Sequence, residues 1–320
     1  AYQQLKSDAI FVVGVSSSTP MKVKIIDKKN EPTLRIVGKD FQLGFDRATG
    51  WLTQYEAAGN KLIADGGTLK ANFWRAVTDN DMGAEFQKKL AAWRSPEMNL
   101  LSLTTQMVKR DKGVEDPIVI AIYDMPAVKA QLKLTYTVFA GGELNVRMQL
   151  ITDKEANISD MLRFGMVMQL PYDMEQSRYF GRGPIENYSD RKAFARIGIY
   201  KQTADQQFFP YIRPQETGTK QDIKWWQQTN ASGTGIEIHG LSGDLSMSAL
   251  HYAIADLDEG QKKHQRHSYQ VPKSPFTNLC IDKEQCGLGG TDSWGSWPLR
   301  PYRLSYKDRS FEFLLRPRVE

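Results

Sequence analysis

Apolar and polar residues alternate along much of this chain, in short runs separated by glycine-rich or polar turns. The two clearest runs are apolar at Leu132, Leu134, Tyr136 and Val138 and then, after Gly141-Gly142, at Leu144, Val146, Met148 and Leu150. Successive side chains of a strand point to opposite faces, so a period of two predicts strands with one buried face. The glycine pair between the runs predicts a β-hairpin.

The same alternation returns along the chain and sets the predicted fold class. The shorter runs are apolar at Phe41, Leu43 and Phe45, at Trp51 and Leu52 beyond a turn at 47–50, at Ile236 and Ile238, at Leu245, Met247 and Ala249, and at Phe311, Phe313 and Leu315. Many short strands with few helical patterns predict an all-β fold, a large antiparallel β-sandwich. In a strand, Trp225 and Trp226 would point to opposite faces, so we expect one of them to pack inward.

One helical pattern interrupts the strands. Phe86, Leu90 and Trp93 recur at i, i+4 and i+7 within residues 84–94, and Pro96 follows. This spacing predicts a short surface helix inside a long connection.

The first residues differ in character from the rest. Polar, proline-bearing stretches at 16–20 and 27–32 are typical of linkers. We therefore expect residues 1–32 to be the tail of a preceding domain plus a linker, and residues 33–320 to form the sandwich domain. The N-terminus has neither an initiator Met nor a signal-like pattern, so we expect the chain to be a segment of a longer polypeptide.

The bulk composition excludes several classes of protein. A hydrophobic content of 41% and a charged content of 25% are typical of a soluble globular domain, and no apolar run reaches the length of a membrane span. The net charge of +5 includes a basic cluster at 262–267, but no nucleic-acid-binding motif surrounds it. We expect no nucleic-acid partner and no membrane partner.

Cysteine and histidine usage does not indicate a metal site. Cys280 and Cys286 fit no zinc spacing, and we expect buried free thiols, with a pair across a tight hairpin as the alternative. The histidines do not cluster as ligands and none lies in a motif with a carboxylate; they are His239, His251, His264 and His267. No metal and no cofactor is expected in this chain.

An acidic triplet is the first candidate for chemistry. Asp79, Asn80 and Asp81 precede Gly83 and could offer oxygen ligands to a hard cation. Their spacing differs from that of a calcium loop, which favours a turn closed by Asx side chains over a metal loop.

Three further carboxylates attract attention. Glu186 and Asp190 lie beside aromatic residues, where they suit either sugar hydroxyls or a buried ion pair, and we favour the ion pair. Glu216 is the best single candidate for acid–base work. A glycosidase needs two carboxyl groups about 5–10 Å apart, and no pair stands out, so we assign no catalytic residue to this chain.

A glycine-rich run near the C-terminal end carries an indole. Gly287, Gly289 and Gly290 leave the backbone free to take conformations closed to other residues, and Trp294 follows. A Trp on a loop shaped by glycine is an unusual core residue and a suitable platform for a sugar ring.

Four ordered motifs resemble the C-terminal, small-chain domain of glycoside hydrolase family 2 β-galactosidases. They are W-R-A-x-x-D-N-D-x-G at 74–83, G-x-G-P-x-E-N-Y-x-D-R at 181–191, P-Y-x-x-P-Q-E-x-G at 210–218 and N-x-x-I-D-x-x-Q-x-G-x-G-G-x-x-S-W at 278–294. The resemblance implies a galactose mutarotase-like supersandwich. Residues 1–6 resemble the last strand of the immunoglobulin-like domain that precedes the small-chain domain in such enzymes.

The resemblance also implies how the work is divided. In the family the two catalytic glutamates belong to an upstream (β/α)₈ barrel, for which this chain has no room. The isolated chain is therefore expected to be inactive, with the barrel and immunoglobulin-like domains of the same polypeptide as its partners. Full-length enzymes often need a divalent cation, which would be bound elsewhere.

Two groups of site residues follow from the resemblance. Trp294, with Ser293 and Asp292, is expected to bind a galactoside or another small carbohydrate. The resemblance also implies a mobile loop beside the active site, with Gly83 as its hinge. The residues of this loop are Asp79, Asn80, Asp81 and Gly83.

Two other functions stay open at this point. One is a carbohydrate-binding module that works alone, and the other is a free-standing mutarotase-like isomerase. The sugar, its linkage and the oligomeric state are left open, as is the compartment, bacterial cytoplasm or periplasm.

Overall fold

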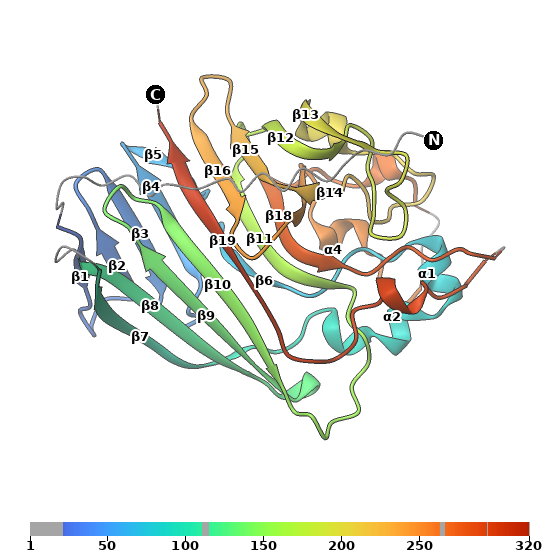
Figure 1. The fold of residues 1–320 in the computed structure, drawn as a ribbon, viewed down its shortest axis with the longest axis horizontal. Coiled ribbons are helices and arrows are strands. Elements are labelled where there is room, and N and C mark those ends of the chain that lie inside the picture. Colours follow the sequence, from blue (N-terminus) through green and yellow to red (C-terminus); the bar gives the residue numbers. More distant parts are fainter. Residues whose placement is uncertain (1–21, 111–114, 263–265, 293, 320) are drawn as a thin grey trace.

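A computed structural model describes residues 22–110, 115–262, 266–292 and 294–319 of the chain. Within these residues two large antiparallel β-sheets form, and their apolar faces pack against each other (Figure 1). The predicted all-β sandwich is therefore confirmed.

The first sheet holds ten of the described strands. Their order is β1 (Lys24–Ile26), β2 (Thr33–Val37), β3 (Phe41–Asp46), β4 (Leu52–Ala57), β6 (Leu69–Asn72), β11 (Arg163–Pro171), β18 (Phe276–Gln285), β17 (Leu245–Leu250) and β14 (Lys220–Ile223), with β5 (Asn60–Lys61) paired to β4. Strands from the start, middle and end of the chain are neighbours in this sheet.

The second sheet holds nine of the described strands. Their order is β13 (Arg196–Thr203), β12 (Gln176–Gly183), β15 (Trp225–Thr229), β16 (Gly235–Gly240), β19 (Arg309–Arg318), β10 (Leu144–Thr152), β9 (Ala130–Val138), β8 (Glu115–Met125) and β7 (Asn99–Lys109). The last strand of the described chain, β19, lies in the middle of this sheet.

Helices are short and lie in the connections. They are α1 (Asp79–Gly83), α2 (Phe86–Lys89), α3 (Ala204–Gln207) and α4 (Ile254–Leu257), with 3₁₀ turns η1 (Ala91–Trp93), η3 (Pro126–Val128), η4 (Ser268–Gln270) and η5 (Arg300–Tyr302). In Figure 1, α1, α2 and α4 gather at one end of the sandwich. In the described part of the chain, no helix combines the length and hydrophobicity that crossing a bilayer requires.

The alternation in the sequence determines which residues fill the space between the sheets. In the predicted hairpin, β9 pairs with β10 from Leu144 opposite Val138 onward, and the apolar positions of both strands are buried. Trp226 on β15 is fully buried while Trp225 stays partly exposed, as the opposite-face argument predicts. Burying a large apolar side chain contributes about 1.5–3 kcal/mol, so this pattern fixes which face of each strand points inward.

Two local expectations differ from the structure. Strand β1 pairs with β2, so Lys24–Ile26 join the first sheet although they lie in the segment predicted as a linker. The predicted helix over 84–94 is shortened and divided: Glu85 adopts a left-handed φ of 63° before α2, and the non-helical Leu90, with φ −109° and ψ 10°, separates α2 from η1. The periodic apolar residues of that segment are nevertheless buried in the core. Residues 1–6, compared above with a preceding domain, lie outside the described residues.

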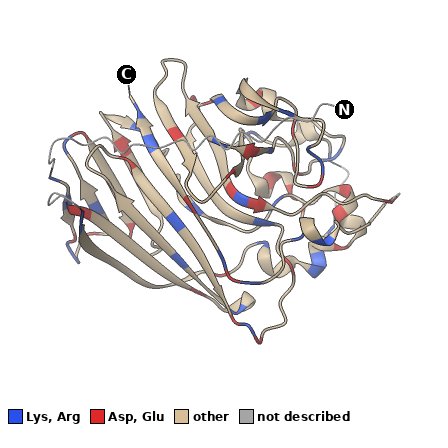
Figure 2. Ribbon diagram, in the orientation of Figure 1, with Lys and Arg blue, Asp and Glu red and all other residues tan. Residues whose placement is uncertain are grey.

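Charges of both signs are scattered over strands and loops (Figure 2). Examples at the surface are the ion pairs Lys61–Asp65 and Lys273–Asp205, each with a nitrogen–oxygen distance of 2.7 Å. Exposed pairs of this kind contribute about 0–1 kcal/mol each, so they influence solubility more than the fold. Part of the basic cluster, residues 263–265, lies outside the described chain.

Candidate functional site

The glycine-rich run and the acidic triplet, far apart in the sequence, meet in the fold. The Asn80 amide on α1 donates to the carbonyls of Leu288 at 3.0 Å and Ser296 at 2.9 Å. Its Oδ1 accepts the backbone N–H of Gly295 at 2.8 Å. One side chain thus satisfies three backbone groups of the loop 287–297, which we call the indole loop because it carries Trp294.

A second polar side chain holds the other flank of the indole loop. The Asp190 carboxylate accepts the backbone N–H of Leu288 at 3.0 Å and of Gly289 at 2.9 Å. Gly289 and Gly290 have φ values of 71° and 77°, where a side chain would strain the backbone. The predicted backbone freedom is confirmed for Gly289 and Gly290; Gly287 has no left-handed φ, but a Cβ atom there would lie 2.4 Å from the Asp190 carboxylate.

A buried ion pair links the triplet to the same loop. Asp81 and Arg75 are fully buried and bind each other through both carboxylate oxygens. Arg75 also donates to the carbonyl of Gly287 at 3.1 Å. Burial alone would lower the pKa of Arg75, but the adjacent Asp81 carboxylate outweighs it and raises the pKa, so the guanidinium stays charged. Losing one member of such a pair costs about 3–5 kcal/mol.

The Trp294 side chain lies at the surface on this framework. It is 65% exposed, and it packs on α1 at Gly83. A Cβ atom added to Gly83 would lie 2.9 Å from Cδ2 and Cε2 of the indole and 2.9 Å from Cα of Gly295. Glycine at this position therefore allows the indole to lie against the helix.

The other predicted site residues are placed as follows. The Asp292 side chain is exposed and accepts the backbone N–H of Trp294 at 3.2 Å, which closes a turn. Ser293 lies outside the described residues. Asp79 begins α1, so the segment expected as a loop is a short helix, capped by Thr78. Its mobility, and a hinge at Gly83, stay predictions.

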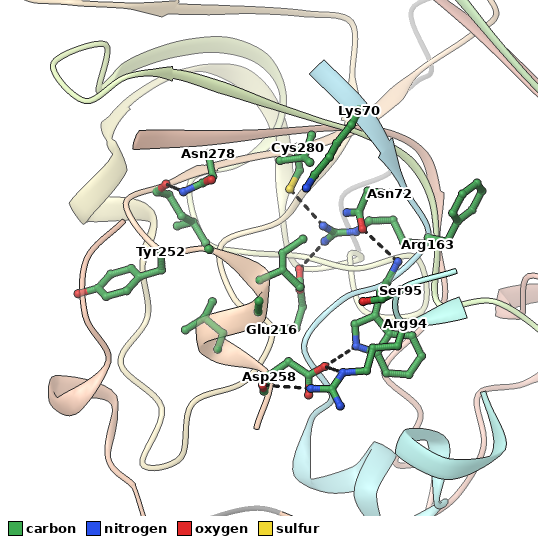
Figure 3. Close-up of a pocket in the computed structure, with 18 of the residues that line it drawn as sticks. Lys70, Asn72, Arg94, Ser95, Arg163, Glu216, Tyr252, Asp258, Asn278 and Cys280 are labelled. Carbon is green, nitrogen blue, oxygen red and sulfur yellow. Dashed lines mark hydrogen bonds and ion pairs between the residues drawn. The ribbon is translucent and has the colours of Figure 1, made fainter. Parts of the chain in front are cut away.

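A cavity of about 570 Å³ lies beside the first sheet (Figure 3). Its floor is an ion-pair network around the buried Arg163, which binds Glu216 at 2.9 Å and Asp282 at 3.3 Å. Arg163 also contacts Cys280 Sγ at 3.1 Å. Burial raises the pKa of Asp282 to about 7, against the opposing effect of Arg163.

Several predicted roles are changed by these contacts. Glu186, expected in an ion pair, is buried among neutral donors: it accepts the N–H of Gly218 at 2.7 Å and the hydroxyls of Thr217 and Tyr211. Glu216, the candidate acid–base residue, is instead bound to Arg163.

The cysteines and histidines also have defined places. Cys280 and Cys286 are buried free thiols, as predicted, and burial raises their pKa values to about 11 and about 12. His239 contacts Glu237 at 2.6 Å and His251 contacts Asp205 at 3.2 Å, pairings that the sequence motifs did not show. His264 lies outside the described residues.

Sequence reasoning missed the residues that organise both sites. Arg75 and Arg163 were not singled out, and Asn80 and Asp190 were noted for other roles. A signal was present for Arg163, a charged residue at the start of the long apolar run of β11, since a charge in such a run needs a partner. No comparable signal existed for the partners of Asn80.

The fold and this surface define a β-sandwich domain with an aromatic platform held on a glycine-shaped loop. A family model described as "Beta galactosidase small chain" matches residues 37–315, and the chain belongs to this family.

Individual relatives agree with this assignment. A beta-galactosidase of Priestia megaterium is 32% identical over 293 residues, which cover 90% of this chain and 27% of that protein. A beta-galactosidase of Lactobacillus delbrueckii subsp. bulgaricus is 32% identical over 264 residues, 82% of this chain and 25% of that protein. The chain thus spans about a quarter of the length of these relatives.

Among solved structures, a galactose 1-epimerase from Lactobacillus acidophilus NCFM aligns with 93% of this chain and 99% of its own length. The sequence identity is 9% and the TM-score is 0.45.

The contact between Gly83 and the indole yields a first prediction. Gly83→Ala adds a methyl group 2.9 Å from the indole and 2.9 Å from the Cα atom of Gly295 without straining a left-handed backbone, so both Trp294 and the loop backbone must move. We expect a changed Trp emission spectrum and a free energy of unfolding lower by about 1–3 kcal/mol, as is typical of overpacking. In a Trp294→Phe background the same substitution should change the spectrum much less; an equal spectral change there would contradict the contact with the indole.

The Asp282 carboxyl yields a prediction about pH. Its pKa of about 7 in the fold exceeds the value of about 3.9 in an unfolded chain. Between these values the folded state binds more protons, so the free energy of unfolding falls as the pH rises. In Asp282→Asn this part of the pH dependence should disappear, by about 1 kcal/mol or more between roughly pH 4 and pH 8.

Urea unfolding at both pH values provides the measurement. Asp65→Asn removes a surface carboxylate whose partner among the described residues is Lys61, and it should keep the slope of the unchanged protein. If Asp282→Asn keeps that slope as well, the Asp282 carboxyl does not titrate in the fold as described.

Proposed function

We propose that this chain is the C-terminal domain of a glycoside hydrolase family 2 β-galactosidase, and that it completes the sugar site of the full-length enzyme. The observation that carries the proposal is the exposed indole of Trp294, held against α1 by the three hydrogen bonds of Asn80. The match to the small-chain family supports the same assignment.

The chemistry of the indole suits a sugar. A pyranose presents apolar C–H groups on one face, and Trp offers the largest aromatic surface against which they can pack. The side chains of Asn80 and Asp190 bind backbone groups of the indole loop on both sides of Trp294. Because the loop is held in this way, little conformational freedom is lost when a ligand stacks on the indole. In this proposal the Trp294 ring orients a galactoside, and it takes no part in proton transfer.

The hydrolytic step belongs to other parts of the proposed enzyme. Retention in a glycosidase uses two carboxyl groups about 5–5.5 Å apart, one as nucleophile and one as acid and base. We place both on an upstream barrel of the same polypeptide. The support is length: this chain corresponds to about a quarter of its beta-galactosidase relatives.

Helix α1 is proposed to close beside the sugar. The hydrogen bonds of Asn80, the packing of Gly83 on the indole and the Arg75–Asp81 pair join α1 to the indole loop, so in this proposal helix and loop close as one unit. Asp79 lies at the exposed start of the helix, next to this contact. A closing segment of this kind excludes water from the reacting bond.

A divalent cation is part of the proposed full-length enzyme. Among the described residues there is no group of three or more His, Cys, Asp or Glu side chains that could hold one. The described side chains therefore offer no such cluster for the ion, and no step of the proposal passes through it.

Kinetics of the full-length polypeptide test the role of the indole. With p-nitrophenyl β-D-galactopyranoside, Trp294→Ala should raise KM about tenfold, since a lost stacking contact of roughly 1.4 kcal/mol changes affinity by that factor. Trp225→Ala is the matched control, because that indole lies on β15 beneath Arg178. The isolated chain should fold and show no turnover.

Two results would contradict the proposal. One is turnover by the pure isolated chain, and the other is an unchanged KM and kcat in Trp294→Ala. Galactose binding by the isolated chain that depends on Trp294 would instead support a carbohydrate-binding module that works alone.

A double-mutant cycle tests whether Asn80 acts through the indole. Asn80→Ala should raise KM in the same direction as Trp294→Ala, because the loop loses three hydrogen bonds. If the two residues act together, the double variant has a KM close to that of Trp294→Ala alone. Additive effects on KM would show that Asn80 acts by another route.

A further inference from the structure

The cavity of Figure 3 is separate from the indole loop. It is lined by residues of β6, β11, β17 and β18, by α4, and by the connection around Ser95; none of its described lining residues comes from α1 or from the indole loop. Its volume of about 570 Å³ lies within the range of about 300–1,000 Å³ that is typical of small-molecule sites.

Glu216 is unevenly satisfied at the wall of this cavity. Its Oε1 atom accepts three hydrogen bonds of 2.9 Å, from Arg163, Thr219 and Gln285. Its Oε2 atom accepts none from the described residues. This atom is not one of the fully buried polar atoms that lack a partner, so it keeps some exposed surface although the residue is only 5% exposed. An acceptor that keeps some exposed surface and has no donor from the described residues is free to accept a hydrogen bond from water or from a ligand.

Asn278 on β18 repeats this arrangement. It is 6% exposed, and its amide nitrogen donates to the carbonyls of Leu250 and Phe276 at 3.4 Å. Its Oδ1 atom has no donor among the described residues and also keeps some exposed surface. Two residues that line one cavity therefore each have an acceptor oxygen without a protein donor, and both oxygens can accept hydrogen bonds from a ligand.

The charges around the cavity favour a neutral ligand. Arg163 is bound to Glu216 and Asp282, and Arg94 is bound to Asp258 at 2.9 Å. Of the described cations that line the cavity, Lys70 alone has no ion pair. An anionic ligand would face the open oxygen of Glu216, whereas hydroxyl groups can donate to that oxygen.

The rest of the lining mixes apolar and polar side chains, which suits both the C–H groups and the hydroxyl groups of such a ligand. Trp74 is fixed in place by a hydrogen bond from its indole N–H to Asp258 at 2.6 Å, and Leu250 and Ile254 lie on the walls with it. Ser95, Thr217 and Ser248 are among the polar residues of the lining.

We propose that this cavity binds a neutral, polyhydroxylated molecule of monosaccharide size, with Glu216 Oε2 and Asn278 Oδ1 accepting its hydroxyl groups. The site is distinct from the Trp294 platform and does not depend on the role proposed for that platform. It gives the domain a carbohydrate site of its own.

Titration of the full 320-residue chain tests this site. D-Galactose and D-glucose are added up to high millimolar concentration, with calorimetry and Trp emission as readouts. Binding of at least one of them is expected, and D-galacturonate should bind at least about tenfold more weakly than galactose, since its carboxylate opposes Glu216.

Matched variants locate the binding. Ala255 is an exposed residue of α4 at the cavity, so Ala255→Trp fills the space without disturbing the core, and it should weaken sugar binding at least about tenfold. Ala193→Trp places the same bulk at an exposed position outside the cavity lining and should bind like the unchanged chain. Trp294→Ala should also keep this binding.

Three outcomes would overturn the proposal. They are the absence of binding by either neutral sugar, unchanged binding in a folded Ala255→Trp variant, and loss of all binding in Trp294→Ala. The last outcome would leave the Trp294 platform as the sugar site, so failure of this proposal is distinguishable from failure of the proposed function.

Discussion

The buried pairing of Arg75 with Asp81 is the interaction on which the indole loop depends. Two charges without access to water are tolerated only when each satisfies the other. Arg75 also binds the carbonyl of Gly287, so the pair fixes helix and loop in one arrangement. Asn80, beside Asp81, is thereby held where its amide meets the loop, and Trp294 is presented at the surface.

A second buried guanidinium, that of Arg163, lies at the cavity. It forms ion pairs with Glu216 and Asp282, which come from distant parts of the sequence. Arg163 and neighbouring donors occupy Glu216 Oε1, and the Oε2 atom has no donor among the described residues. Both regions thus use a buried guanidinium to position neighbouring polar side chains.

The sequence allowed the fold to be predicted more fully than the sites. Alternation identifies strands such as β9 and β10 because burial of one face is a local property. The helix expected over 84–94 was wrong in form because apolar spacing does not report the left-handed φ of Glu85 or the non-helical backbone of Leu90. The partners of Asn80 lie more than 200 positions further along the chain, as its separation of 208 from Leu288 shows. No local pattern encodes such a contact.

The central place of β19 has a consequence for the order of assembly. This strand, Arg309–Arg318, bridges β16 and β10, so the described strands of the second sheet stay in two halves until residues 309–318 have been synthesised. Such non-local pairing is slow and leaves strand edges exposed during biosynthesis. A ribosome that stops before residue 309 would therefore release a chain in which this sandwich is not closed.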